Sequence, residues 1–108
     1  MIQKPTEINI LGIRYTVTYA SNPADVDIYK RQTCWGQIDY WTRTIRIYDN
    51  GRPIEDIWQT ILHEVLHGIG ELLHIDTLMN DQNKEETIGL LALALADVAT
   101  RNKWWELE

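Results

Sequence analysis

The pattern of hydrophobic and polar positions divides the chain into a strand-rich first half and a helical second half. Between Ile13 and Tyr19, Ile, Tyr and Val alternate with Arg and Thr, the period-two pattern of a half-buried strand. Shorter strands are expected at 8–10, 36–40 and 44–48, each bounded by turn residues. The segment 21–33 shows neither period, and we interpret it as a loop with room for a short helix.

From Pro53 onward the apolar residues recur at helical spacing. Glu55 and Asp56 suit the positive end of a helix dipole, and Pro53 suits its first position. The apolar stripe that follows consists of Ile54, Ile57, Ile61, Val65, Ile69 and Leu72. The opposite side carries His63, His67, Gly70 and His74. Because this helix is apolar around most of its circumference, we expect the histidine face to line a cleft.

A second helix is predicted from about Lys84 to Arg101, after a polar, turn-like segment at 75–83. Its predicted stripe consists of Ile88, Leu91, Leu95 and either Val98 or Ala99. With 108 residues, the chain is expected to form a single domain, 1–108. The predicted fold class is α+β: a small antiparallel sheet of about four strands in the N-terminal half, packed on two C-terminal helices.

Charge and cysteine content narrow the possible partners. A formal net charge of −6 argues against binding nucleic acid, which needs a basic face. Cys34 is the single cysteine, so no internal disulfide can form, and a reducing, cytoplasmic setting is expected. No signal peptide is evident, and no apolar run approaches the length of a membrane span, so no membrane association is expected.

The first predicted helix contains His63-Glu64-x-x-His67, a spacing suited to zinc. Two histidines four residues apart lie about 6 Å apart on one face, so both can reach one ion at about 2.0–2.1 Å. Glu64 points about 100° away, beside a metal-bound water whose proton it can accept during attack on a carbonyl. The alternative is a pair of core histidines hydrogen-bonded to neighbouring backbone.

A zinc site of this kind needs a third protein ligand. His74 shares the histidine face but lies about 10 Å beyond His67 on a straight helix, so we expect it to cap the helix end instead. Glu71 lies at the edge of the same face, where a solvated carboxylate is the simpler interpretation. Glu85 and Glu86, at the start of the second predicted helix, are the other candidates.

The sequence resembles the gluzincin metallopeptidases, which carry His-Glu-x-x-His on one helix and a ligand Glu on the next. Eighteen residues separate His67 from Glu86, an interval found in several gluzincin branches. The segments GQIDYWTRTIRIYDN and EETIGLLALAL flank the motif as in small gluzincin-like proteins of phages and prophages. The resemblance implies a minimal zincin-like fold with Glu86 as third ligand, and Glu85 is the next choice. Asn83 and Glu86 also fit a capping box, a competing role for Glu86.

The resemblance also implies a function: a zinc-dependent endopeptidase acting on a peptide or protein substrate. Zn²⁺ would be held by His63, His67 and Glu86, and Glu64 would activate the water. An edge strand, either 36–40 or 44–48, would pair with the substrate. Tyr40 and Tyr48 are candidates for stabilising the oxyanion, although packing within the sheet is the favoured interpretation of both, and His74 is a further candidate for that role. The alternative is a non-catalytic zinc-binding interaction or structural protein of phage origin. A further hypothesis is that the tail 104–108 covers the cleft. The oligomeric state and the substrate are not predicted.

Overall fold

The computed structural model describes residues 4–27, 34–74 and 83–101, with backbone alone at 97–101. The chain forms β1 (Glu7–Ile10), β2 (Ile13–Ala20), a 3₁₀ turn η1 (Pro23–Asp25), β3 (Gly36–Asp39), β4 (Thr44–Tyr48), α1 (Ile54–Leu73) and α2 (Lys84–Arg101). The predicted strands and helices are therefore confirmed, most of them to within one residue. The hypothesis about the tail 104–108 concerns residues outside the described part.

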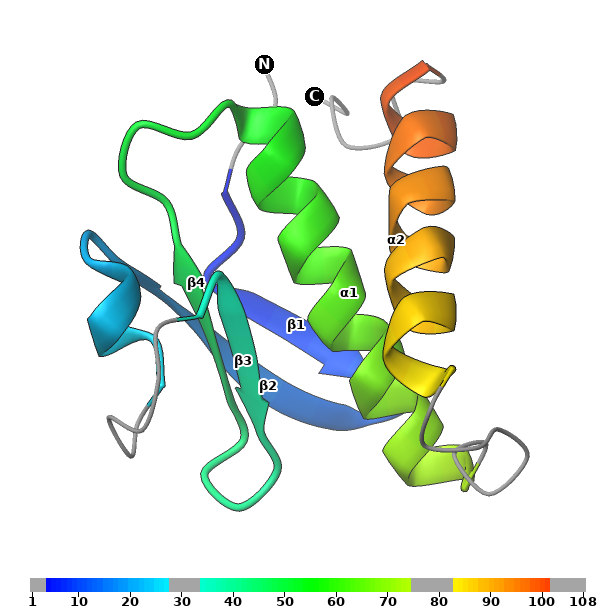
Figure 1. Ribbon diagram of the computed structural model, residues 1–108. Coiled ribbons are helices and arrows are strands. Elements are labelled where there is room, and N and C mark those ends of the chain that lie inside the picture. Colours follow the sequence, from blue (N-terminus) through cyan, green and yellow to red (C-terminus); the bar gives the residue numbers. More distant parts are fainter. Residues whose placement is uncertain (1–3, 28–33, 75–82, 102–108) are drawn as a thin grey trace.

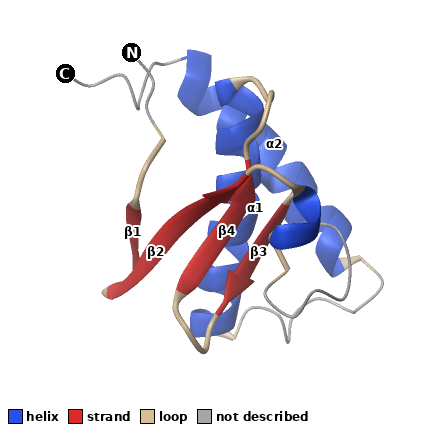
Figure 2. Cartoon of the chain, turned by 90° about the vertical axis from the view of Figure 1, so that its left-hand side faces the viewer, coloured by secondary structure: helices blue, strands red, loops and turns tan. Residues whose placement is uncertain are grey.

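The four strands form one sheet in the order β1-β2-β4-β3, with both helices on the same side of it (Figures 1 and 2). A tight turn at Leu11 and Gly12, both with positive φ, joins β1 to β2. β3 and β4 form the second antiparallel hairpin, with Ile38 opposite Ile45. Within the described residues, β3 pairs only with β4, so its outer side is an edge of the sheet.

The expectation of an antiparallel sheet is wrong in one respect, because β2 and β4 run parallel. Their register places Val17 opposite Ile45 and Tyr19 opposite Ile47. Parallel neighbours need a long crossover connection, and residues 21–43 supply one that includes β3. β4 takes the central position because both of its inward residues, Ile45 and Ile47, are completely buried. β3, which carries Gly36 and Asp39, lies at the edge. The sheet is mixed, because one of its three strand pairs is parallel and the other two are antiparallel.

The core lies between the sheet and α1. Ile57 and Ile61 of α1 pack against Tyr15, Val17, Ile45 and Ile47, with Val65, Ile69 and Leu72 partly buried around them. The predicted apolar stripe of α1 therefore faces the sheet. Each fully buried Ile contributes roughly 1.5–3 kcal/mol relative to an exposed one. Gly68 allows close approach, since an added Cβ would come 2.9 Å from Ile10 Cδ1.

Helix α2 packs alongside α1, but through a different face from the predicted one. Ile88, Ala92 and Ala96 are buried, whereas Leu91 and Leu95 are exposed. An Ala has no bulk beyond Cβ, so a stripe of small residues lets two helices approach more closely than a stripe of leucines. Among the described residues, no helix has the length and apolar character needed to span a membrane.

Candidate metal centre

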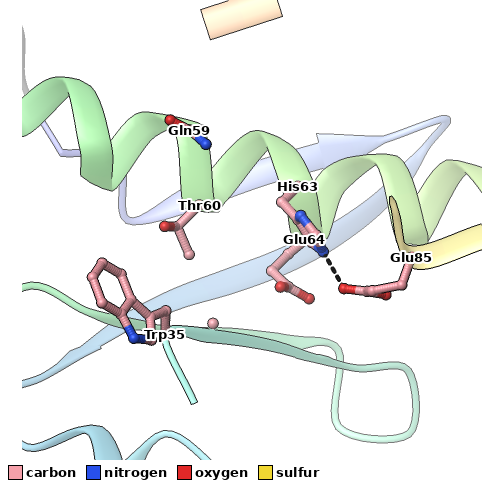
Figure 3. A pocket seen from close by; sticks show the side chains of 7 residues that line it. Trp35, Gln59, Thr60, His63, Glu64 and Glu85 are labelled. Carbon is pink, nitrogen blue, oxygen red and sulfur yellow. Dashed lines mark hydrogen bonds and ion pairs between the residues drawn. The ribbon is translucent and has the colours of Figure 1, made fainter. Parts of the chain in front are cut away.

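Three side chains from two helices converge at one point. His63 Nε2 lies 2.6 Å from Glu85 Oε1, and His67 Nε2 lies 2.9 Å from Glu85 Oε2. The two histidine Nε2 atoms are 3.2 Å apart. In the described part of the chain, these residues form the one group of three or more potential metal ligands. Figure 3 shows His63 on α1 and Glu85 on α2 pointing toward each other.

The positions of these ligands follow from the helices that carry them. His63 and His67 are one turn apart on the side of α1 that faces α2. Glu85 lies in the first turn of α2, in line with the buried residues of that helix, three residues before Ile88 and seven before Ala92, and its own side chain is exposed. Gly89 follows one turn later, and a Cβ there would lie 3.8 Å from the His63 ring. The His63 ring is therefore within ordinary van der Waals reach of this turn of α2.

The structure brings Glu85, not the expected Glu86, to the two histidines. Glu86 is exposed and is not part of the three-residue group. One residue along a helix rotates a side chain by about 100°, which turns Glu86 away from α1. The motif residues His63 and His67 do come together as predicted. Glu85, the second choice from the sequence, is the carboxylate that meets them.

The donor set fits a metal such as Zn²⁺. Two imidazole nitrogens and a carboxylate make a three-ligand set like that of catalytic zinc sites with a fourth position for water. Tetrahedral bonds of about 2.0–2.1 Å would place ligand atoms roughly 3.3 Å apart. The two Nε2 atoms are 3.2 Å apart, and the Glu85 oxygens lie at the shorter hydrogen-bonding distances of 2.6 and 2.9 Å from them. Burial lowers the pKa of His67, and Glu85 opposes this while His63 adds to it. A lowered pKa favours the neutral imidazole that a metal requires.

Glu64 is the buried acid of the site. Its side chain comes from α1 next to His63, and the residue is only 7% exposed. Burial, followed by the negative charge of Glu85, raises the pKa of Glu64 to about 8, and a hydrogen bond from the Ile38 backbone acts in the opposite direction. A carboxyl with a pKa near neutrality can both accept and return a proton.

Close contact with β3 fixes the position of Glu64. An ideal Cβ on Gly36 would lie 3.1 Å from Glu64 Oε2 and 2.6 Å from Thr60 Cγ2. Only a glycine leaves room here for both side chains of α1. Together with the hydrogen bond from Ile38, this places the carboxylate against the edge strand of the sheet.

A cavity of about 230 Å³ opens beside these residues. Its lining comprises Trp35, Gly36, Gln59, Thr60, His63, Glu64 and Glu85. In Figure 3 the Trp35 ring lies at the end of this cavity away from Glu85. Trp35, Gln59 and Thr60 are not among the site residues expected from the sequence. One usable signal was that Gln59 and Thr60 lie one turn before the histidine pair, on the same helix.

The other sequence candidates do not line this cavity. The Tyr40 hydroxyl donates a hydrogen bond to the His67 carbonyl oxygen at 3.2 Å, and Tyr48 packs against Trp35. His74 is the C-terminal cap of α1, as expected, with a left-handed φ of 56°. Glu71 is exposed and, like His74, is not part of the three-residue group.

Comparison with other proteins adds no assignment: no protein-family model, curated protein or solved structure matches the chain.

Proposed function

We propose that this protein is a zinc-dependent metallopeptidase. His63, His67 and Glu85 are the metal ligands, and Glu64 is the general acid and base. The observation that carries the proposal is the convergence of the two Nε2 atoms and the Glu85 carboxylate, with Glu64 lining the same cavity as His63 and Glu85. These are the roles implied by the resemblance to gluzincins, with Glu85 in the place expected for Glu86.

The chain supplies the proton transfers of the reaction. A divalent metal at the three ligands would polarise the scissile carbonyl and lower the pKa of water. Glu64 Oε2 lies beside Gly36, at the wall of the cavity, and takes the proton released as water attacks the carbonyl carbon. The same carboxyl then delivers that proton to the departing amine, which breaks the peptide bond. A bound cation would also offset the burial that disfavours the charged form of Glu64.

The edge strand β3 is the expected binding site for an extended peptide. Its outer side is unpaired within the described sheet, and Glu64 meets it at Ile38. A peptide that adds to this edge by backbone pairing would carry its carbonyl groups past Glu64. β4 was the other candidate strand, but it is paired on both sides. The proposed substrate is therefore an extended segment of a peptide or unfolded protein.

The test is cleavage of a denatured protein, such as reduced casein, by the zinc-loaded chain. We expect wild type to produce fragments that chelator abolishes. Glu64→Gln should lower the rate by at least about 100-fold while metal content stays the same. Glu71→Gln is the matched control, an exposed carboxylate on the same helix that should keep full activity.

The second candidate function is a non-catalytic zinc-binding module. It is favoured by one observation: Glu64 is buried and hydrogen-bonded to β3, so it also ties α1 to the sheet. In that case zinc would stabilise the fold, and neither wild type nor Glu64→Gln would cleave the denatured protein.

We also propose a cytoplasmic location. The chain has one cysteine, so it forms no internal disulfide, as is usual in reducing compartments. Fractionation of expressing cells would test this, and recovery in a secreted or membrane fraction would contradict it.

A further inference from the structure

A second cavity lies on the side of the sheet that faces away from both helices. Its volume is about 400 Å³, and its lining comprises Thr18, Tyr19, Ala20, Ser21, Asp25 and Arg46. None of these residues belongs to the candidate metal centre. We infer that this cavity binds a zwitterionic amino acid, whose carboxylate pairs with Arg46 and whose ammonium group pairs with Asp25. The inference does not depend on the proposed peptidase activity.

The strand pattern places this cavity opposite the helices. Side chains of a strand alternate between its two faces. Val17 of β2, together with Ile45 and Ile47 of β4, is buried in the core against α1. Thr18 and Arg46, which are partners in the β2–β4 register, therefore point to the other face. In Figure 1 the η1 turn lies on this same side, away from α1 and α2. The sheet thus separates the cavity from the metal centre.

Arg46 is the cation of the cavity. Its Nε is buried and has no hydrogen-bond partner within the described residues, and no ion pair in that part of the chain includes its guanidinium. Gln37 lies opposite Arg46 in the β3–β4 register, but its amide N–H donates to Asp27 Oδ1 at 2.9 Å. A partly buried guanidinium loses hydration, and a counter-charge compensates for that loss. A carboxylate in the cavity would supply this charge and accept two parallel hydrogen bonds from Nη1 and Nη2.

Two hydroxyl groups line the cavity as well. Thr18 and Ser21 are both exposed there. The backbone at this point is fixed, because Asn50 Nδ2 donates to the Ser21 carbonyl at 3.3 Å and the Asp49 N–H donates to the Ala20 carbonyl at 3.2 Å. A hydroxyl can donate to a carboxylate oxygen and can also accept from an ammonium group. These two side chains therefore suit either end of a zwitterion.

Asp25 determines which anions the cavity can accept. It is exposed at the end of η1. A carboxylate has about four acceptor sites, so Asp25 can bind an ammonium group of a ligand in addition to its contacts within the protein. Its charge repels a second anionic group, and the net charge of −6 on the chain acts in the same direction. One guanidinium and one carboxylate therefore favour a ligand with one charge of each sign over a phosphate.

The turn that carries Asp25 is anchored at both ends. Asn22 Oδ1 accepts from the Ala24 N–H at 2.9 Å, and the Pro23 carbonyl accepts from the Cys34 N–H at 3.1 Å. A preformed site has little ordering to do when a ligand binds. The volume of about 400 Å³ falls within the roughly 300–1,000 Å³ of small-molecule sites, so there is room for an amino acid together with its side chain.

The test is an NMR titration of the isotope-labelled, zinc-loaded full chain with four compounds: L-alanine, L-alaninamide, N-acetyl-L-alanine and inorganic phosphate. Alaninamide lacks the carboxylate, and N-acetylalanine lacks the ammonium group. We expect alanine to bind at least about 5-fold more tightly than each of the other three and to shift the backbone amide signals of Thr18, Ser21 and Asp25. Arg46→Gln should lower the affinity for alanine by at least about 5-fold. Asp25→Asn should bring the affinities for alanine and N-acetylalanine to within about two-fold of each other.

The matched controls are Arg14→Gln and Glu7→Gln, which remove two exposed charges of the same sheet that do not line the cavity. Both should keep the wild-type affinities. Since an amino acid can also bind zinc, the titration is repeated in chelator, where the affinity for alanine should stay within about two-fold. Thermal melts confirm that each variant is folded, and the comparison of the four compounds on wild type decides the matter even if a variant unfolds.

Three results would overturn the inference. The first is no measurable binding of alanine, or equal binding of all four compounds. The second is tighter binding of phosphate than of alanine, which would indicate a site for anions alone. The third is a set of shifted signals around His63 and His67 in place of those at Thr18 and Ser21, which would place alanine at the metal centre.

Discussion

Gly36 of β3 lies against Glu64 of α1 so closely that a Cβ on Gly36 would fall 3.1 Å from Glu64 Oε2. The same Cβ would lie 2.6 Å from Thr60 Cγ2, a separation that real Cβ contacts essentially never show. The proposed general base is therefore positioned by the edge strand as well as by its own helix.

Gly36→Ala should lower peptidase activity by at least about 10-fold, because Glu64 must move or β3 must shift. Thr60→Ser removes the methyl that the new Cβ meets at 2.6 Å and keeps the hydroxyl that accepts from Arg52. The double variant should regain part of the lost kcat. Full activity in Gly36→Ala, or no recovery in the double variant, would show that this contact does not position Glu64.

Gly89 provides a contrasting glycine next to another site residue. A Cβ there would lie 3.8 Å from the His63 ring, an ordinary contact. Since Ala is favoured over Gly inside a helix by about 1 kcal/mol, Gly89→Ala should stabilise the protein and leave metal binding intact. Urea unfolding measures the first effect and metal titration the second. A loss of metal affinity would contradict an ordinary contact between Gly89 and the His63 ring.

The buried acid Glu64 should reduce the stability of the metal-free protein. Folding raises the pKa of Glu64 from 4.5 to about 8. The free energy of unfolding is therefore highest below pH 4.5, where the carboxyl is neutral in both states, and it falls as pH rises toward 8. In chelator at pH 8, Glu64→Gln should therefore melt higher than wild type by roughly 4 °C or more. At pH 5 the difference should shrink, because both side chains are then mostly neutral. Glu71→Gln, exposed on the same helix, should show neither effect.

Arg52 should matter more for stability than its position in a loop suggests. Its two terminal nitrogens join β4 to α1 through three hydrogen bonds. A lysine cannot reproduce this fork, so Arg52→Lys should cost about 1–3 kcal/mol of unfolding free energy. Arg14→Lys is the control, since Arg14 is exposed and its pair with Glu7 is at 3.7 Å. Equal urea midpoints for the two variants would contradict this role.

The sequence predicts those features that depend on local pattern. Alternation located β2, and the stripe from Ile54 to Leu72 identified both the extent of α1 and its core face. The spacing of His63 and His67 identified two members of the metal group because one helical turn separates them. Such features need no knowledge of distant neighbours.

Features set by distant contacts were not predictable in the same way. The parallel pairing of β2 with β4 depends on where a long connection returns to the sheet. The choice between Glu85 and Glu86 depends on the face of α2 that meets α1. The leucines indicated one face, but the small residues Ala92 and Ala96 are buried instead. Two helical turns before Ala92, the same face of α2 carries Glu85.

The most direct test of the metal centre is zinc content after purification and dialysis, compared between Glu85→Gln and Glu86→Gln. Both variants remove one charge from the same helical turn, and both residues are exposed. We expect one zinc per chain in wild type and in Glu86→Gln. Glu85→Gln and His63→Ala should lose zinc during dialysis, because each lowers the zinc affinity by at least about 10-fold. Zinc retained by Glu85→Gln and lost by Glu86→Gln, or no zinc in wild type under any condition, would contradict the proposed site.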